Sequence, residues 1–235
     1  FGGVFDGRHV YFSPQCNDDG RHGHALRYDT LGDFSDAAAW QGYDAGSTSG
    51  LVTKGYYGCL FDGRYVYYVP RTDGETMHAR VLRFDTQGAF DDDGSWSAFD
   101  AGRPVSCQGG AFDGRHVYFA PGYHQQDGES GCVLRFDTQG AFDDDGSWTW
   151  YDASATSGLD CRCYDGALYD GRHVYFVPLQ GGPVLRYDPR QPFTDASAWE
   201  AFDSTGVPGF AGCVGAVFDG RFVHFVPYAH GTVVR

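Results

Sequence analysis

The stretch FDGRHVYF at residues 5–12 returns unchanged at residues 112–119. Near copies stand at three other places: FDGRYVYY at 61–68, YDGRHVYF at 169–176 and FDGRFVHF at 218–225. The opening aromatic residues of successive copies are 49 to 57 residues apart. Self-similarity at such a period is typical of stacked or radial repeat architectures. We therefore divide the sequence into five repeats that open near residues 1, 57, 108, 165 and 214.

Each copy predicts a hairpin of two strands, which we call a and b. Asp-Gly stands between an apolar segment such as GGVF (2–5) and a β-rich segment such as HVYF (9–12). This pattern favours a hairpin with a type I′ turn. A proline follows nine residues after the opening aromatic in every repeat, and we expect it to end strand b because it lacks a ladder donor. These prolines are Pro14, Pro70, Pro121, Pro178 and Pro227.

Two further strands, c and d, are predicted in each repeat. Strand c is expected in the segments ALRYD (25–29), VLRFD (81–85 and 133–137), VLRYD (184–188) and VVR (233–235). Strand d is expected to open at Trp40, Trp96, Trp148 and Trp199. Four short antiparallel strands repeated radially form a β-propeller.

We therefore expect an all-β fold, a five-bladed β-propeller of four-stranded antiparallel blades, that occupies residues 1–235 as a single domain. The last blade is expected to lack its outer strand in this chain, because the sequence stops at Arg235 within strand c of that blade. Phe1 likewise falls inside a strand, so we expect the chain to be a piece of a longer one.

This order of strands resembles a kelch blade across essentially the whole chain. Kelch repeats carry a Gly-Gly pair after strand b, where this chain has a proline, so the resemblance implies the topology and no functional residue. The number of blades is similar to that of tachylectin-like lectins and arabinanase-like glycosidases, although a shared fold does not imply a shared function.

The segment AFDDDGSW occurs at 89–96 and again at 141–148, between strands c and d. It resembles the Asp-box of sialidases, but Gly94 adjoins Ser95 directly, and the Asp-box has one residue between them. We expect a polar turn packed by Phe90 and Trp96. We expect the chain to need no cofactor. The aspartates are weak candidates for a calcium site, since calcium favours oxygen ligands. These candidates are Asp91, Asp93, Asp143 and Asp145.

The connections between strands differ in how much their length varies. The a–b and c–d turns lie in segments of constant spacing, whereas the b–c and d–a connections change length from repeat to repeat. In an up-and-down blade the b–c and d–a connections emerge on one face. Binding chemistry is usually placed on loops that vary over a rigid scaffold. We therefore predict that the binding site lies in these connections and that FDGRHVYF belongs to the scaffold that carries them.

The variable connections supply a mixture of aromatic, imidazole and charged groups. Such a mixture suits sugars, which need an apolar platform and directional hydrogen bonds, and it equally suits a protein partner. We therefore expect a non-catalytic binding propeller for a glycan or protein ligand. The candidate ligand-binding residues are His22, His24, Tyr56, Tyr57, His78, Arg103, Tyr123, His124, Arg162, Tyr164, Tyr228 and His230.

The alternative function is a glycoside hydrolase, which needs two carboxylates about 5–10 Å apart in a central pocket. The carboxylates that suit this alternative are Asp160, Asp165, Glu75 and Glu129.

Three of the seven cysteines, Cys107, Cys163 and Cys213, lie five or six residues before the strand-a aromatic of their repeat. Strand a lines the channel of a propeller, so these thiols are predicted to ring its mouth. Buried thiols are the default expectation for them. A vicinal arrangement of Cys161 and Cys163, a disulfide among neighbouring loops and a soft-metal site are the alternatives.

The chain has 17 basic and 31 acidic residues, a formal net charge of −14. Such a surface repels a phosphate backbone, so no nucleic-acid partner is expected. No apolar run is long enough to span a bilayer, so no membrane insertion is expected.

Overall fold

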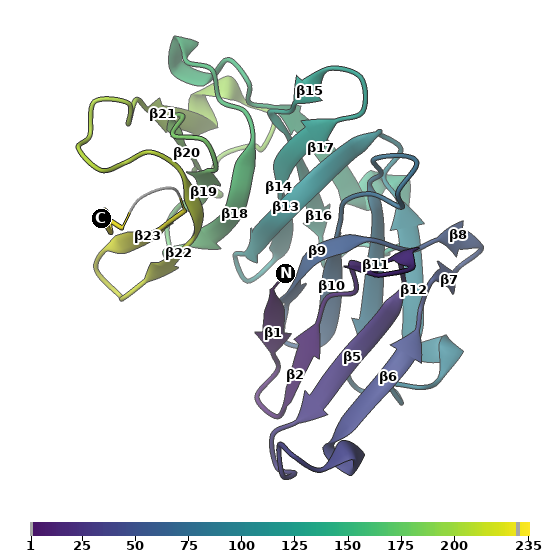
Figure 1. Cartoon of the computed structure of the whole chain (residues 1–235). Helices are drawn as coiled ribbons and strands as arrows, with labels where there is room; N and C mark the ends of the chain where they lie inside the picture. The colour runs from purple at the N-terminus through teal and green to yellow at the C-terminus, as the bar shows by residue number, and fades with distance from the viewer. Residues whose placement is uncertain (1, 229–230) are drawn as a thin grey trace. The chain divides into compact units, whose positions relative to one another are not determined.

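A computed structural model describes residues 2–228 and 231–235. Regular structure in this part of the chain consists of β-strands and single-turn 3-10 helices (Figure 1). The chain divides into two compact units, unit 1 up to Ser106 and unit 2 from Cys107 onward. Each unit is described by itself. No helix among the described residues is long and apolar enough to cross a membrane.

Unit 1 contains two four-stranded antiparallel sheets and two short hairpins. The first sheet has the order β1 (Gly3–Phe5), β2 (His9–Phe12), β5 (His24–Asp29) and β6 (Trp40–Asp44). The second has the order β9 (Tyr56–Phe61), β10 (Tyr65–Pro70), β11 (Arg80–Asp85) and β12 (Trp96–Asp100). The hairpins are β3 (Cys16–Asn17) with β4 (Gly20–Arg21), and β7 (Ser47–Thr48) with β8 (Leu51–Val52). Strands a to d are thus confirmed in both repeats.

Unit 2 contains two further sheets of the same order and a final hairpin. One sheet has the order β13 (Val105–Phe112), β14 (His116–His124), β16 (Cys132–Asp137) and β17 (Trp148–Asp152), with β15 (Gly128–Glu129) paired to the end of β14. The next has the order β18 (Tyr164–Tyr169), β19 (Val174–Pro178), β20 (Val184–Tyr187) and β21 (Trp199–Phe202). The hairpin is β22 (Cys213–Phe218) with β23 (Val223–Pro227).

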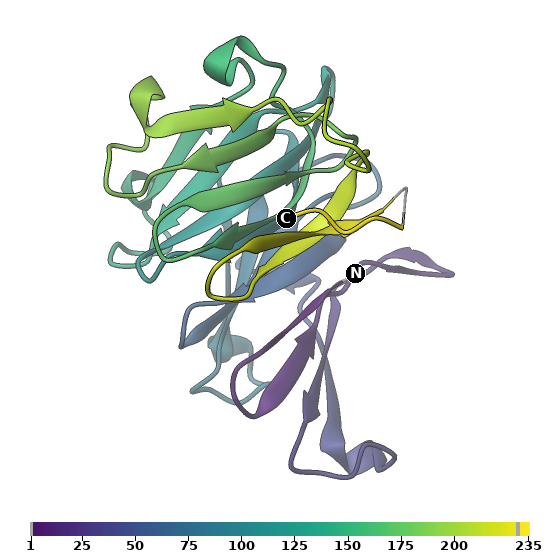
Figure 2. The same cartoon turned by 90° about the vertical axis from the view of Figure 1, so that its left-hand side faces the viewer.

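In the last repeat the predicted strand c is reduced to an isolated bridge between Val234 and Phe225. Figure 2 shows the green β18–β21 sheet and the yellow β22–β23 hairpin side by side. Five single-turn 3-10 helices complete the regular structure: η1 (Ala37–Ala39), η2 (Asp93–Ser95), η3 (Asp145–Ser147), η4 (Thr156–Gly158) and η5 (Ala196–Ala198).

Two details of the predicted hairpins are wrong. In the first turn Gly7 has φ +105°, but Asp6 and Arg8 are not at positive φ. Positive φ at the first central position alone is the pattern of a type II′ turn, whereas type I′ needs it at both. Strand b also does not always end at its proline, because β14 continues past Pro121 and pairs with β15.

The repeated Asp-Gly-Arg segment closes each hairpin through the aspartate side chain. In the third repeat Asp113 Oδ1 accepts from the backbone N–H of Arg115 at 2.8 Å and of His116 at 2.6 Å. Its Oδ2 accepts from the buried Tyr118 hydroxyl at 2.7 Å. Arg115 also pairs with Asp137 at the end of strand c at 2.6 Å. The octapeptide therefore has a structural role, because its polar groups bond within its own sheet.

Aromatic rings join successive sheets within each unit. In unit 1, Trp96 at the start of β12 stacks on Tyr43 of the preceding sheet, with ring centroids 5.0 Å apart. In unit 2, Trp199 stacks on Tyr151 in the same way at 4.7 Å. Such pairs stabilise by about 0.5–1.5 kcal/mol beyond their burial. Trp96 and Trp199 are therefore both core residues of their own sheet and contacts to the sheet before it.

Glycines allow strands a of consecutive repeats in unit 2 to approach each other closely. Gly109, Gly166 and Gly215 each lie three residues before the strand-a aromatic, and all have positive φ. A Cβ on Gly109 would lie 2.8 Å from Gly166 Cα, and one on Gly166 would lie 3.2 Å from Gly215 Cα. Backbone therefore meets backbone where consecutive inner strands pack.

Candidate functional site

In unit 1 the variable connections meet at Gly55. Its N–H donates to His22 O at 3.2 Å, and its carbonyl accepts from Thr72 N at 3.1 Å, so it joins the b–c connections of both repeats. Gly55 has φ +70°, and a Cβ there would lie 1.8 Å from Thr72 O. The position therefore admits only glycine, and it fixes the d–a connection between the two b–c connections.

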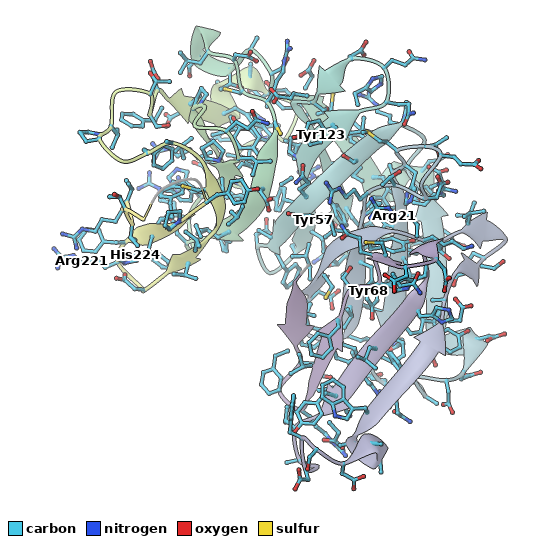
Figure 3. The ribbon with its side chains drawn as sticks, in the orientation of Figure 1. Arg21, Tyr57, Tyr68, Tyr123, Arg221 and His224 are labelled. Carbon is cyan, nitrogen blue, oxygen red and sulfur yellow. The ribbon has the colours of Figure 1, made fainter. Side chains whose placement is uncertain are left out.

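Arg21, Tyr57 and Arg71 come from the segments that meet at this junction, and we call them the Arg21 cluster; Figure 3 labels Arg21 and Tyr57. The aliphatic part of Arg21 lies over Gly55 and Gly74, where added Cβ atoms would meet it at 3.3 and 3.5 Å. The guanidinium of Arg71 lies 4.6 Å from the Tyr57 ring centroid. The cluster offers two guanidinium groups and an aromatic ring, which suits acceptor groups on a ligand.

Tyr56 and His78 lie beneath this surface and not on it, because both are buried. His78 Nε2 donates to Lys54 O at 3.0 Å, while Nδ1 accepts from Arg80 N at 3.3 Å, so the imidazole is neutral. Burial, with the charge of Arg80, lowers the pKa of His78 to about 4. Burial raises the pKa of Tyr56. Both residues therefore have a structural role and are not exposed to a ligand.

The other predicted residues of unit 1 are more exposed. His22 is half-buried, and its Nδ1 accepts from His24 N at 3.2 Å. The exposed His24 lies 3.9 Å from the Asp44 carboxylate. Arg103 and Glu75 are exposed in their connections.

In unit 2 Tyr123, labelled in Figure 3, contacts side chains of two later connections, and we call Tyr123, Cys163 and Gln180 the Tyr123 cluster. The Tyr123 hydroxyl contacts both the Cys163 thiol and the Gln180 side chain. Its hydrogen bond with Cys163, together with burial, raises the pKa of Tyr123 to about 12. Tyr123 is half-buried, so part of its ring faces solvent next to these polar groups.

A buried polar pair lies on β13 and β18, the strands a of the third and fourth repeats. Gln108 on β13 donates from Nε2 to Asp165 Oδ2 on β18 at 3.4 Å. Gln108 is 2% exposed and Asp165 is 7% exposed. Gln108 Oε1 is buried without a hydrogen-bond partner. A buried carboxylate beside an unsatisfied amide oxygen is costly and marks a candidate site.

The remaining predicted residues of unit 2 have separate environments. Tyr164 is buried and donates to Pro183 O at 3.2 Å. Arg162 pairs with the exposed Asp160 at 3.2 Å. His124 lies 3.0 Å from Asp127, and Glu129 is exposed on β15. Tyr228 is 70% exposed, and His230 lies outside the described residues.

The cysteines are thiols, since all seven are free. The predicted channel residues Cys107, Cys163 and Cys213 are buried, as expected of small apolar side chains. Burial raises the pKa of Cys107 and of Cys213. Among the described residues no three His, Cys, Asp or Glu side chains are grouped so as to hold a metal.

The Asp-rich turns have a structural role. Asp92 and Asp144 cap the helices η2 and η3, and the neighbouring Asp93 accepts from Tyr43 Oη at 2.5 Å. The calcium candidates Asp91, Asp93, Asp143 and Asp145 are all exposed. The expected packing is confirmed, because Trp96 Nε1 donates to Phe90 O at 2.9 Å and their rings are 5.3 Å apart.

Sequence reasoning missed Arg21, Arg71, Gln108 and Gln180. Arg71 carried a usable signal, because most arginines stand in Asp-Gly-Arg or Leu-Arg and Arg71 does not, whereas Arg21 stands in an Asp-Gly-Arg segment outside the repeated octapeptide. The two glutamines carried none, since their partners come from other repeats.

Comparison with known proteins supports the fold alone. No protein-family model matches the chain, and no curated protein matches it. A solved structure entitled "Structure of YjhT" is similar over 95% of this chain and 70% of that chain, with a TM-score of 0.58 and 12% sequence identity. The chain therefore has an all-β fold of repeated antiparallel sheets.

Proposed function

We propose that the chain is a five-bladed β-propeller domain that binds glycans through the face formed by its b–c and d–a connections. One observation carries this proposal: Gln108 Oε1 is buried without a partner beside the buried Asp165. An unmade hydrogen bond at a buried group costs about 1–3 kcal/mol. A ligand hydroxyl can remove that cost, because it donates to one oxygen while it accepts from another donor.

The Tyr123 cluster supplies the other requirements of sugar recognition. The half-buried Tyr123 ring is an apolar platform for C–H groups, and the Gln180 amide both donates and accepts. Unit 1 by itself offers the Arg21 cluster, in which the Arg71 guanidinium lies over the Tyr57 ring, an arrangement that suits oxygen acceptors. A protein ligand would use the same groups, so it is the second outcome of the test below.

A glycan-array screen of the intact chain, repeated with EDTA, tests the proposal. Specific binding that persists in EDTA is expected, because the proposed contacts need no metal. Asp165→Asn should weaken binding about tenfold or more, since a hydrogen bond to a charged acceptor contributes about 1.5–3 kcal/mol. Asp160→Asn is the matched control, because Asp160 is exposed and pairs with Arg162.

A blank array contradicts the glycan proposal and directs the search to protein ligands. Hydrolysis of a bound glycan, lost in Asp165→Asn, would support the glycoside hydrolase alternative instead.

A further inference from the structure

The buried pair of unit 2 stands at a position of the repeat where the scaffold requires no polar group. Gln108 and Asp165 each lie four residues before the strand-a aromatic of their repeat. The same position holds Tyr57 in the second repeat and Val214 in the fifth. Because apolar Val214 also lies within its strand a, this strand forms without a polar side chain there. The pair is therefore particular to the third and fourth repeats, and folding alone does not explain it.

The orientation of the Gln108 amide determines what the pair offers to a ligand. A carboxylate only accepts hydrogen bonds, so the amide nitrogen faces Asp165, and Nε2 lies 3.4 Å from Asp165 Oδ2. The amide oxygen takes no part in that contact and is buried without a partner. Because both amide atoms are attached to one carbon, Oε1 and the carboxylate lie within reach of one small donor group. The pair therefore offers acceptors together with a negative charge.

Among the groups that a glycan carries, a protonated amine matches these acceptors better than a hydroxyl does. An ammonium group has three donors and no acceptor, whereas a hydroxyl has one donor and two lone pairs. A hydroxyl can therefore satisfy one of the oxygens, while an ammonium can donate to both and also offsets the buried charge. A calcium ion is a poorer match, because it takes about six to eight oxygen ligands and the pair supplies few.

The variable connections of unit 2 also carry an excess of negative charge. The b–c and d–a connections of its third and fourth repeats are residues 125–131, 153–163, 179–183 and 203–212. Their carboxylates are Asp127, Glu129, Asp160 and Asp203, and their one basic side chain is Arg162. Arg162 pairs with Asp160 at 3.2 Å. A surface of this charge attracts cationic ligands and repels acidic ones.

We propose that the group bound by Gln108 and Asp165 is a protonated amine, so that the ligand is a cationic glycan built of amino sugars. This inference rests on the proposed function, because it specifies which glycan occupies that site. The ammonium donates to Gln108 Oε1 and to the Asp165 carboxylate.

The probes are two tetrasaccharides that differ in charge, β-1,4-linked glucosamine and its N-acetylated form. Calorimetric titration of the intact chain measures both affinities at about pH 6, below the pKa of amino groups. Salt at about 0.15 M screens attraction between distant exposed charges. The glucosamine probe should bind about tenfold more tightly or better, because hydrogen bonds between charged groups are about twice as strong as neutral ones. The ratio of the two affinities is the readout, since a damaged fold weakens both probes alike.

Asp165→Asn should bring this ratio close to one, because asparagine keeps the shape of the side chain and removes its charge. Gln108→Met should lower the ratio as well, because it removes Oε1 at similar volume. Asp160→Asn is the matched control: it removes an exposed charge from the connection before Asp165 and should leave the ratio unchanged. Thermal unfolding midpoints check the fold of all three variants.

Several results would overturn the inference. Equal affinity for the two probes would do so and leave the proposed glycan function standing. Tighter binding of a uronic acid oligosaccharide would do so in favour of the Arg21 cluster. A ratio that persists in Asp165→Asn would show that the overall charge attracts the amine and that the pair does not bind it. Binding of neither probe would overturn the inference too, and a blank array beside it would contradict the proposed function itself.

Discussion

Replacing Asp113 by asparagine should destabilise the chain in a pH-dependent way. Burial alone would raise the pKa of Asp113, but hydrogen bonds from His116, Tyr118 and Arg115 outweigh it and hold the pKa at about 2, below the ordinary 3.8. That shift corresponds to about 2 kcal/mol of stability at pH 7. We reduce it to about 1–2 kcal/mol because the turn borders solvent.

The sign follows from the lowered pKa. The folded state holds the carboxylate charged at lower pH than the unfolded state does, so its stabilisation is full above about pH 5 and disappears as the pH falls through 2. About half should be lost at pH 3. Asparagine does not titrate, and its Nδ2 cannot accept the bond from the buried Tyr118 hydroxyl.

Urea unfolding of the wild type and of Asp113→Asn at pH 7 and pH 3 measures this effect. The difference in free energy of unfolding between the two proteins should be about 1–2 kcal/mol at pH 7 and about half that at pH 3. The equivalent aspartates of the other repeats titrate in both proteins, so their contribution cancels. The exposed Asp143→Asn is the control. A difference that stays the same at both pH values would refute the reasoning.

Three further predictions concern single residues. Gly166→Ala should reduce the free energy of unfolding by about 2–4 kcal/mol, because backbone strain at φ +94° adds to a close approach to Gly215. Gly220→Ala, also at φ +94° but with nothing within 4 Å of the added Cβ, should reduce it by about 1–2 kcal/mol. Equal losses of thermal stability would contradict this. His78→Gln should lose less stability between pH 7 and pH 4 than the wild type does, by up to about 3 kcal/mol. In the wild type the imidazole binds a proton in the unfolded state over this range, whereas the buried imidazole, with its pKa lowered to about 4, stays largely neutral. Parallel pH profiles of the two proteins in urea unfolding would argue against this. Cys16 is the exposed thiol, so Cys16→Ser should remove the fastest phase of labelling by a thiol reagent under native conditions, and an unchanged time course would disprove that assignment.

The strand order was predictable because it depends on contacts within one repeat. Trp96 and Phe90 are six residues apart, and the bonds of Asp113 reach only as far as Tyr118, so a fixed spacing records both. The turn type was not predictable from Asp-Gly alone, because Asp113 bonds the backbone with its side chain and leaves positive φ to Gly114.

The candidate site was less predictable, because its contacts join different repeats. Tyr56 and His78 were assigned to loops by their sequence position, yet the close packing around Gly55 buries them. Gln108 and Asp165 are 57 residues apart, and nothing in either local sequence reports that they meet. Length variation located the connections, but only tertiary packing decides which side chains within them are exposed.

The glycine contacts between inner strands have a consequence for how such a chain can change. Because Gly109, Gly166 and Gly215 meet through backbone atoms, this part of the join between consecutive repeats requires no matched pair of side chains, while the tryptophan and tyrosine that stack elsewhere along it recur at fixed positions of the repeat. A repeat copied from one position can follow any other without a compensating substitution at the glycine contact. Duplication of whole repeats therefore preserves the scaffold, while each copy is free to acquire a different set of loops.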